Sequence, residues 1–580
     1  MALEHHDYDV LVLGSGGSGL RAAIAAAEAG ARTALVCKSL LGKAHTVMAE
    51  GGLAAALGNV MPADSWSIHF QDTLFGGKYL NNWRMAELHA KEAPDRVREL
   101  EHWGAVFDRT PERLMSQRAF GGHTYRRLVH IGDRTGLEMI RTLQDKTVHS
   151  NVDVFMEATI TTLIKDGERV VGCFGYQRAT GEQISFSAKA LVLATGGSGR
   201  IHKITSNSQD CTGDGYALAF AAGAELVDME FIQFHPTGMV YPPGVAGLLV
   251  TEAVRGEGGL LRNKDGERFM ERYDPKRMEL STRDVVARAI YTEVKEGRGT
   301  PHGGAYLDVS HLDSDYVKRR LPSMYDQFLE LAGVDITKEP MQVGPTCHYF
   351  MGGIKVDPDT GETRVPGLFA TGEASGGMNG ANRLGGNSLG DLVVFGRRAG
   401  IGAAETANRA DAVSLPAGEV NAAEAQIDHY LNGDGGDQFE NPFQMHKDLQ
   451  KVMGDGVGIF RDKDGLTDAI TKLESLERRT DHLRAPSNRV DYNPGWQLCQ
   501  EVKNMLTVSL MIARAALMRE ESRGGHSRLD YTGYSDYWGE HNIVIHSDGD
   551  KDMSLTPTPV VKRDELEELV EARKESEKAS

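Results

Sequence analysis

The chain has 580 residues, of which 40% are hydrophobic and 25% charged, as is typical of a globular protein. A chain of this length is too long for one hydrophobic core, so several domains are expected. The formal net charge of −18 argues against a nucleic-acid-binding surface, although local arginines can still bind small anions.

The cysteines are scattered and form no CxxC pair; they are Cys37, Cys173, Cys211, Cys347 and Cys499. We therefore predict no disulfide framework, zinc site or iron–sulfur cluster in this chain. No run of about 18 apolar residues occurs, so no membrane-spanning helix is predicted. The N-terminus lacks the charged-then-apolar order of a signal peptide, which predicts a cytosolic protein that only partners would hold at a membrane.

A glycine-rich turn lies between two predicted strands near the N-terminus. Residues 8–13, YDVLVL, predict a buried parallel strand, and residues 33–37 predict a second one. Between them, GSGGSG precedes an alanine-rich helix predicted at 20–29, which is the context that a GxGxxG dinucleotide-binding turn requires. The candidate pyrophosphate contacts are Gly14, Gly16, Gly17 and Gly19. The alternative is a glycine-rich turn in another kind of α/β sheet.

Lys38 stands near the end of the second strand, where an acidic residue usually binds the ribose. This disfavours NAD and requires a ligand with further contacts. Two later segments, ALVLATGG at 190–197 and PGLFATGE at 366–373, each predict a strand that ends in a turn, as in flavoproteins with the two-nucleotide fold. They indicate FAD, with candidate contacts at Ala194, Thr195, Gly196 and Glu373. The alternative is two unrelated buried strands.

The remaining elements alternate between strands and helices. Strands are predicted at 152–164 and 169–177, and a helix at 212–222 carries Asp214. Residues 239–344 lose the nucleotide-binding pattern, which indicates an inserted domain. Apolar periodicity then predicts helices at 423–431, 443–453, 465–483 and 497–518. Weak strands follow, and we interpret the charged stretch 563–578 as a solvated helix or tail.

Ordered motifs over nearly the whole length resemble the flavoprotein subunit of succinate dehydrogenase and quinol:fumarate reductase. They include GSGGSG, HTVMAEGG, ATGG, TGDG, FHPTG, TEAVRGEGG, TRDVVARA, PTCHYFMGG, PGLFATGE, ANRLGGNSLGDLVVFGR and ESRGGHSR. The resemblance implies an α/β fold: a Rossmann-like FAD-binding domain with an inserted α+β capping domain, then a helical domain and a small C-terminal domain. The expected ranges are 1–236 and 346–415 (FAD-binding), 237–345 (capping), 416–528 (helical) and 529–580 (C-terminal domain and tail).

The resemblance also implies FAD attached covalently to His45 of the HTV motif. By itself, a loop histidine would be interpreted as a surface or hydrogen-bonding residue. The other cofactor-binding residues carried over are Lys38, Thr46, Gly51, Gly52, Asp214, Glu373, Asn387, Ser388 and Leu389. Glu50 matches the fumarate-reductase-like spelling of the motif, whereas succinate dehydrogenases most often have glutamine there, so the direction of the reaction stays open.

Interconversion of succinate and fumarate moves a hydride and a proton on a dianion, so the site needs donors and cations at both carboxylates. The resemblance assigns His235, Thr251 and Glu252 to one side, and His348 and Arg383 to the other. Arginine binds a carboxylate bidentately, which suits Arg383. The proton carrier carried over is Arg283, with Glu252 and Arg255 as relay partners. A lone arginine would more often form a structural salt bridge.

Because the chain has no cluster ligands, the resemblance implies membrane anchor subunits with quinone and an iron–sulfur partner subunit. Iron–sulfur clusters and any haem would lie only in those partners. We expect the protein at the cytoplasmic face of the cell membrane, peripheral through its partners, with succinate oxidation favoured.

Two other interpretations remain. An L-aspartate oxidase or soluble fumarate reductase would hold FAD without a covalent bond, which His45 disfavours. A flavin-containing RNA-binding or scaffold protein is disfavoured by the acidic net charge and by the set of His235, Arg283, His348 and Arg383.

Overall fold

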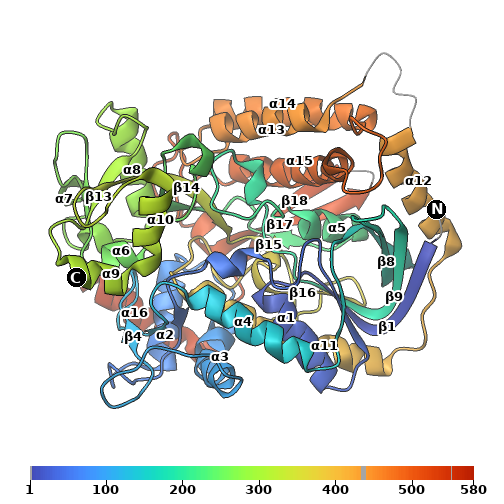
Figure 1. Cartoon of the computed structure of the whole chain (residues 1–580), viewed down its shortest axis with the longest axis horizontal. Coiled ribbons are helices and arrows are strands. Elements are labelled where there is room, and N and C mark those ends of the chain that lie inside the picture. The colour runs from blue at the N-terminus through green and yellow to red at the C-terminus, as the bar shows by residue number, and fades with distance from the viewer. Residues whose placement is uncertain (1–2, 433–438, 550–551, 580) are drawn as a thin grey trace.

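The computed structural model describes residues 3–432, 439–549 and 552–579 (Figure 1). The strands of its central sheet are β1 (Leu3–Leu13), β2 (Thr33–Val36), β6 (Asp153–Phe155), β7 (Ala158–Asp166), β8 (Arg169–Gln177), β9 (Gln183–Leu193) and β16 (Leu368–Ala370). Their order is β6-β2-β1-β9-β8-β7, and β16 also pairs with β9. The strands β6, β2, β1, β9 and β16 run parallel, whereas β7, β8 and β9 pair antiparallel. The predicted α/β class is confirmed.

The turn between β1 and α1 (Gly17–Glu28) requires its glycines. Gly14 has φ +112°, and a side chain there would lie 2.3 Å from the carbonyl oxygen of Ala194, the residue that follows β9. A side chain at Gly19 would lie 1.8 Å from the carbonyl oxygen of Gly14. The helix therefore packs directly on the turn, and the start of α1 stays open to a ligand.

Helix α1 packs against α11 (Asn387–Arg409), the helix that begins within the motif ANRLGGNSLGD. At their crossing, a side chain at Gly400 would lie 2.2 Å from the carbonyl oxygen of Ala22. Other elements around this part are η1 (His45–Met48), α2 (Trp66–Gly76), α3 (Trp83–His102), α4 (Thr135–Val148), α5 (Asp214–Ala222), β3 (Leu53–Ala54), β4 (Gln117–Arg118) and β5 (Leu128–Val129). The starts of α1 and α11 thus come from parts of the chain that lie far apart in sequence.

The inserted segment forms the green lobe at the left of Figure 1. Its elements are β11 (Ile232–Met239), α6 (Ala253–Gly256), β12 (Leu260–Arg262), α7 (Met270–Tyr273), α8 (Arg283–Lys295), β13 (Ala305–Asp308), α9 (Ser314–Arg320), α10 (Pro322–Ala332) and β14 (Met341–Phe350). The antiparallel sheet β11-β14-β13-β12 carries its own hydrophobic core, which includes Val250, Leu307 and Met324. The predicted boundaries at 237 and 345 fall within β11 and β14, the strands that lead into and out of this segment. The domain boundaries remain predictions.

In Figure 1, α13 (Pro442–Gly456) and α14 (Lys463–Arg479) lie along the top, with α15 (Pro494–Met518) below them and α12 (Ala417–Asn432) at the right. The helix predicted at 465–483 ends as an α-helix at Arg479. Helix α15 is buried along most of its length, and its Trp496 stacks on Tyr176 of β8 at a centroid distance of 4.0 Å. This helix therefore packs directly on the central sheet.

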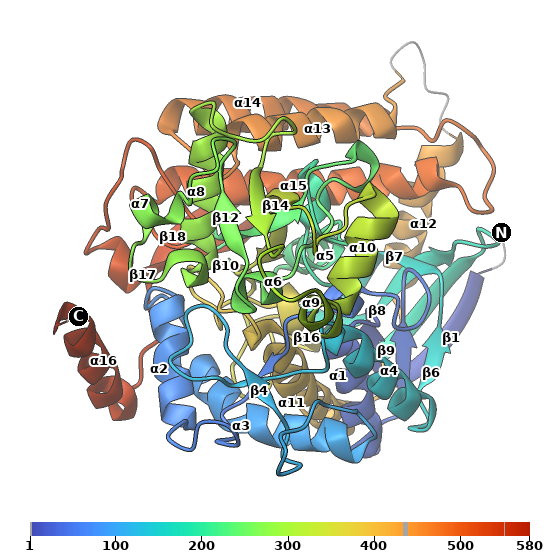
Figure 2. The same ribbon diagram turned by 60° about the vertical axis from the view of Figure 1, so that its left-hand side comes forward.

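The C-terminal part begins with the hairpin of β17 (His541–Gly549) and β18 (Asp552–Pro559), which joins β10 (Leu226–Val227) and β15 (Gly353–Ile354) in one sheet. The last helix, α16 (Glu567–Ala579), lies beside α2 in Figure 2. The interpretation of residues 563–578 as solvated is therefore wrong for one face. Leu566, which ends the short turn of helix before α16, and Val570 of α16 are buried in one hydrophobic cluster with residues of α2.

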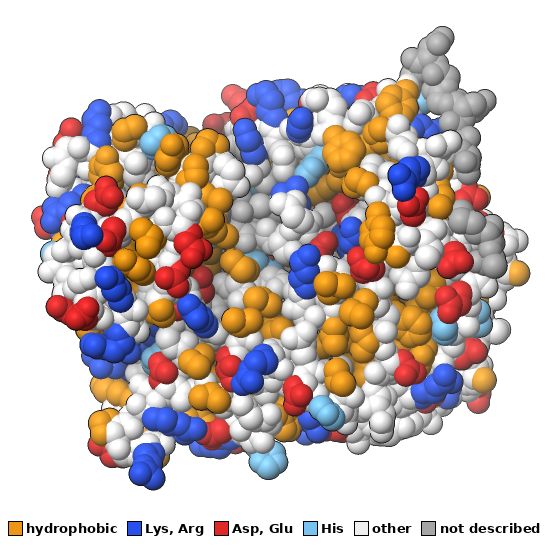
Figure 3. Space-filling model, viewed as in Figure 1, with side chains coloured by type: hydrophobic (Ala, Val, Ile, Leu, Met, Phe, Trp, Pro, Cys, Tyr) orange, Lys and Arg blue, Asp and Glu red, His pale blue; other side chains and the backbone are white. Residues whose placement is uncertain are grey.

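Within the described ranges, no helix is both long and apolar enough to cross a bilayer. The five cysteines are free thiols. The described part of the chain contains no group of three potential metal ligands. On the face shown in Figure 3, acidic and basic side chains are interspersed, and the described residues form no continuous basic patch there.

Candidate active site

One elongated pocket collects most of the residues singled out from the sequence. Those that line it are Gly14, Gly16, Gly17, Lys38, His45, Thr46, Gly51, Gly52, Ala194, Thr195, Gly196, Asp214, His235, Thr251, Glu252, Arg283, His348, Glu373, Arg383, Ser388 and Leu389. Gly19, Arg255 and Asn387 are not among its lining residues. The pocket joins the glycine turn after β1 to the polar side chains of the inserted segment.

The nucleotide end of the pocket lies at the start of α1. Gly16 caps this helix without a side-chain hydrogen bond, and the Gly17 N–H donates to Thr46 Oγ1 at 3.2 Å. The remaining backbone N–H groups of the first turn have no partner within the helix, as a bound pyrophosphate would require. The glycines leave free the space that Cβ atoms would occupy. This space and the N–H donors together fit the phosphates of FAD.

Lys38 is part of a buried polar cluster. Its Nζ donates to Thr212 Oγ1 (2.8 Å), Asp214 Oδ2 (2.8 Å) and Glu501 Oε1 (2.7 Å), which uses all three ammonium protons. Burial opposes this charge, but Asp214 and Glu501 raise the pKa of Lys38 above its ordinary value. The lysine therefore orients two carboxylates. Glu501 lies on α15, and nothing in that helix's apolar pattern indicated it.

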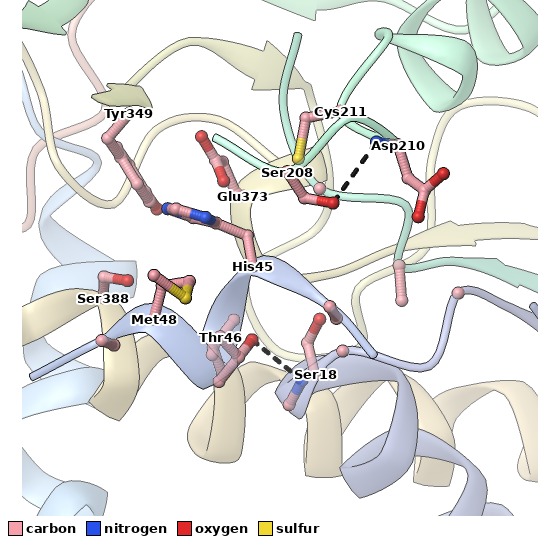
Figure 4. A pocket seen from close by; sticks show the side chains of 18 of the residues that line it. Ser18, His45, Thr46, Met48, Ser208, Asp210, Cys211, Tyr349, Glu373 and Ser388 are labelled. Atoms are coloured by element: carbon pink, nitrogen blue, oxygen red, sulfur yellow. Dashed lines mark hydrogen bonds between the residues drawn. The ribbon is translucent and has the colours of Figure 1, made fainter. Parts of the chain in front are cut away.

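His45 projects from η1 into the pocket, which Glu373 and Met48 also line (Figure 4). Its Nε2 accepts a hydrogen bond from Asn207 Nδ2 at 3.3 Å, and its Nδ1 is buried without a hydrogen-bond partner. Burial and the nearby Arg383 lower the pKa of His45 to about 4. The imidazole is therefore neutral at pH 7, the state that a nucleophilic nitrogen requires.

The polar end of the pocket brings two arginines together. Arg283 Nε lies 2.7 Å from Glu252 Oε2, and its Nη1 donates to Gln233 Oε1 at 3.2 Å. Arg383 Nη2 donates to the same Gln233 oxygen at 3.0 Å. Sequence reasoning missed Gln233, although it stands two residues before His235 and strand alternation would place both on one face.

Positive charge exceeds negative charge at this end. Burial and Arg283 lower the pKa of Arg383 to about 9. Burial and these arginines also hold the pKa values of His235 and His348 well below the ordinary histidine value. The guanidinium groups of Arg283 and Arg383 thus both line this end of the pocket, and a dianionic ligand would relieve their repulsion.

Arg255 lies behind Glu252, away from the pocket. Its Nη2 is 3.6 Å from Glu252 Oε2, three residues along, where the chain enters α6. Glu252 and Arg255, three residues apart, therefore lie on one face of this turn. Glu252 thus pairs both with Arg283, which lines the pocket, and with Arg255, which does not.

Phe120 is a pocket residue that no sequence pattern indicated. A side chain at Gly51 would lie 2.5 Å from its Cζ, and one at Gly385 would lie 2.4 Å from its Cδ1. The next residue, Gly121, donates its N–H to Glu252 Oε1 at 3.0 Å. The loop that carries Phe120 therefore shapes the wall and fixes the carboxylate of Glu252.

Three histidines contact Gly385 and Asn387, where α11 begins, from behind the pocket wall. His69 Nε2 lies 3.0 Å from Asn387 Oδ1, and His89 Nε2 lies 3.1 Å from the carbonyl oxygen of Asn387. His123 Nε2 lies 2.8 Å from the carbonyl oxygen of Gly385. Because the acceptors are oxygens, each ring donates. Burial lowers the pKa values of His89 and His123 to about 4, so these two rings are neutral. Asn387 thus supports the wall from behind.

Glu50, in the motif HTVMAEGG, lines the pocket, and its Oε2 is buried without a hydrogen-bond partner. Burial and the neighbouring Asp133 raise the pKa of Glu50 well above its usual range. The protonated form of this carboxyl is therefore favoured more than that of a solvent-exposed glutamate. In that form it donates a hydrogen bond, as the amide of a glutamine would.

The raised pKa of the Glu373 carboxyl can be tested through the stability of the flavin-free protein. Burial raises the pKa of this carboxyl from 4.5 to about 7. The folded state keeps the proton while the unfolded state releases it, so the stabilisation is complete below pH 4.5 and is lost as the pH rises towards 7. We expect the free energy of unfolding to fall by on the order of 3 kcal/mol over this window because of Glu373.

Urea unfolding at a series of pH values measures this effect. The variant Glu373→Gln should make the dependence less steep, whereas Glu182→Gln, at an exposed position, should leave it unchanged. Equal slopes for the parent and Glu373→Gln between pH 4.5 and 7 would contradict the assignment.

Comparison with known proteins gives two family matches. The family described as "FAD binding domain" matches residues 9–389, and the one described as "Fumarate reductase flavoprotein C-term" matches residues 446–574. Among curated relatives, the fumarate reductase (CoM/CoB) of Methanothermobacter marburgensis contains a chain that is 46% identical, over 94% of this chain and 98% of its own. The succinate dehydrogenase flavoprotein subunit of Coxiella burnetii is 39% identical, over 93% of this chain and 94% of its own.

Solved structures of related proteins also match this chain over nearly its whole length. Sdh1 of Mycobacterium smegmatis in complex with UQ1 is 54% identical, with a TM-score of 0.87 over 97% of this chain and 96% of the other. A variant of the E. coli quinol fumarate reductase flavoprotein is 36% identical, with a TM-score of 0.91 over 97% and 98% of the two chains.

Proposed function

Because the chain belongs to the FAD-dependent family of succinate dehydrogenase and fumarate reductase flavoprotein subunits, we propose that it is the catalytic flavoprotein of a succinate:quinone oxidoreductase. In this proposal it interconverts succinate and fumarate on FAD bound covalently at His45. Electrons pass first to an iron–sulfur subunit, then to a membrane anchor with quinone. The chain would be peripheral at the cytoplasmic face of the membrane, with succinate oxidation as the favoured direction.

One observation carries the proposal. The same pocket holds a glycine turn suited to a dinucleotide, the neutral His45, and a polar end with Arg283 and Arg383. A dianion bound there would lie beside the flavin and not in a separate cavity. When bound, FAD supplies the hydride acceptor or donor for a substrate carbon.

The side chains of the polar end would divide the work between binding and proton transfer. Arg383 would bind one carboxylate, with His348 beside it, while His235 and Thr251 would bind the other. Arg383 is also held over the Tyr349 ring at 4.2 Å, which fixes the guanidinium in place. These groups would hold the substrate so that the bond between its central carbons faces the flavin.

Arg283 would carry the proton. Its Nε–H donates to Glu252 at 2.7 Å, so a proton that Arg283 gives to the substrate carbon in fumarate reduction would be replaced through Glu252, and a proton taken from succinate would leave by the same route. Arg255, on the far side of Glu252, would restore the proton without opening the pocket to water. The approach of both guanidinium groups to Glu252 Oε2 supports this order of transfer.

Malonate tests the substrate class. It is a dicarboxylate that lacks the carbon–carbon bond to be oxidised, so it should bind between the two ends of the site without reacting. We expect malonate to raise the apparent KM for succinate and to leave kcat unchanged in a steady-state dye-reduction assay. Malonamide, which has the same skeleton without charge, is the control and should not compete.

Equal inhibition by malonate and malonamide would contradict a site built on two arginines. Absence of competition by malonate would contradict the dicarboxylate substrate itself.

A further inference from the structure

The C-terminal helix α16 reaches a buried carboxylate on α2. Arg573 Nη2 lies 3.2 Å from Asp72 Oδ1, and the side chain of Asp72 is fully buried. Arg573 Nη1 also donates to Thr124 Oγ1 at 3.3 Å. Thus the last helix of the chain contacts two residues that lie far away in sequence, Thr124 at 449 positions and Asp72 farther still.

The register of α16 on α2 is fixed, so this contact is built into the fold. Leu566 and Val570 are buried in the same hydrophobic cluster as residues of α2. Gln71 Nε2 donates to the carbonyl oxygen of Leu569 at 2.7 Å. Arg573 follows Leu569 by four residues, which places it one turn further along the same face. Figure 2 shows the two helices side by side.

Asp72 in turn holds the loop of residues 120–124. Thr124 donates its N–H to Asp72 Oδ2 at 2.8 Å and its hydroxyl to Asp72 Oδ1 at 2.6 Å. Arg127, just after the loop, approaches Asp72 Oδ2 at 3.0 Å. Both carboxylate oxygens of Asp72 are therefore bonded to Thr124 of the loop and to one of the two arginines, Arg127 or Arg573.

The other end of this loop lies in the active site. Phe120 is part of the pocket wall, and the Gly121 N–H donates to Glu252 Oε1 at 3.0 Å. His123, between the two ends, contacts the Gly385 carbonyl at 2.8 Å. Hydrogen bonds thus run from Arg573 through Asp72 and Thr124 to the loop, whose other end holds the carboxylate that pairs with Arg283.

We infer that Arg573 is a positioning residue for the succinate–fumarate reaction: it anchors loop 120–124 through Asp72 and Thr124, and the loop holds Glu252 under Arg283. The inference rests on the proposed function, because it takes Glu252 as the partner of the proton carrier. The carboxylate of Glu252 is buried, and its Oε1 accepts a hydrogen bond from the backbone of the loop, so its orientation depends on the position of the loop. A loop that is free at its Thr124 end would leave this acceptor less well held.

The test compares Arg573→Gln with Lys574→Gln in the full-length chain within its complex. Lys574 is the adjacent residue of α16, and it contacts Glu571 and the Tyr79 ring in place of Asp72. We expect Arg573→Gln to lower kcat about threefold to tenfold, as one weakened hydrogen bond would. KM and bound flavin should not change, because the residues proposed to bind the substrate carboxylates lie off the loop. Lys574→Gln should resemble the parent.

Hydrogen exchange gives a readout that does not depend on turnover. Amides in a peptide that covers residues 120–124 should exchange about threefold to tenfold faster in Arg573→Gln, and not in Lys574→Gln. Thr124→Val, which removes the hydroxyl that Asp72 and Arg573 share, should produce most of the same kcat loss. Adding Arg573→Gln to it should then cause little further loss.

Equal kcat and exchange in Arg573→Gln and Lys574→Gln would overturn the inference, and so would fully additive losses in the double variant. A parent protein without succinate oxidation would overturn the proposed function instead. In that case the exchange result still decides whether Arg573 holds the loop.

Discussion

Arg283→Ala is expected to abolish the interconversion of succinate and fumarate while the protein keeps its flavin. Arg283 is the guanidinium that lies both in the pocket and 2.7 Å from Glu252, so its removal deprives the reaction of its proton carrier. Loss of a positioned acid–base group costs about 10²–10⁴-fold in rate, and Arg283 also contributes charge that the dianion requires. We therefore expect a fall at or beyond the upper end of that range.

The matched control is Arg288→Ala on the same helix, α8. Arg288 pairs with Asp284 at 3.0 Å and does not line the pocket. Rates in both directions and the flavin absorbance per chain are measured for the two variants. A variant that kept more than about a tenth of the parent rate would have lost far less than such a group contributes. Arg283 could then not be the proton carrier.

His45→Ala is expected to bind FAD reversibly and to lose succinate oxidation far more than fumarate reduction. A bond from the flavin to the imidazole of His45 should raise the reduction potential of the flavin, which favours electron transfer from succinate. A fall of about 30 mV in a two-electron potential changes the equilibrium tenfold. Loss of the bond should therefore shift the ratio of the two rates by at least about tenfold.

The ratio of the two rates in one preparation cancels differences in protein amount and in bound flavin. The potential of the flavin, measured by titration with redox dyes, should fall in parallel. Equal losses in both directions with an unchanged potential would refute this account of His45. Flavin that stays attached to His45→Ala after denaturation would place the bond elsewhere.

The fold and the nucleotide end could be predicted because their signals are local in sequence. Gly14 and Gly19 are required within one strand–turn–helix unit, where a side chain would meet backbone at 2.3 and 1.8 Å. The family resemblance and the α/β class are confirmed by relatives that cover nearly the whole chain. The assignments of individual site residues remain proposals, although the pocket gathers most of them.

What the sequence did not indicate depends on contacts between distant elements. Gln233 joins Arg283 to Arg383 across 50 and 150 positions of the chain, and its amide has no distinctive spacing. Glu501 reaches Lys38 from a helix whose apolar periodicity explains its sequence without any ligand role. In the same way, the charged C-terminal stretch looked solvated because its two buried positions, Leu566 and Val570, are few among many charges.

The most direct test of the central claim follows the flavin of the purified protein in the absence of its partners. The flavin is reduced with dithionite without oxygen, excess dithionite is removed, and one equivalent of fumarate is added. If the pocket joins a dicarboxylate to FAD as proposed, the visible absorbance of oxidised flavin returns, and it does not return in Arg283→Ala. If fumarate leaves the parent flavin reduced while air reoxidises it, this chain is not a succinate–fumarate enzyme.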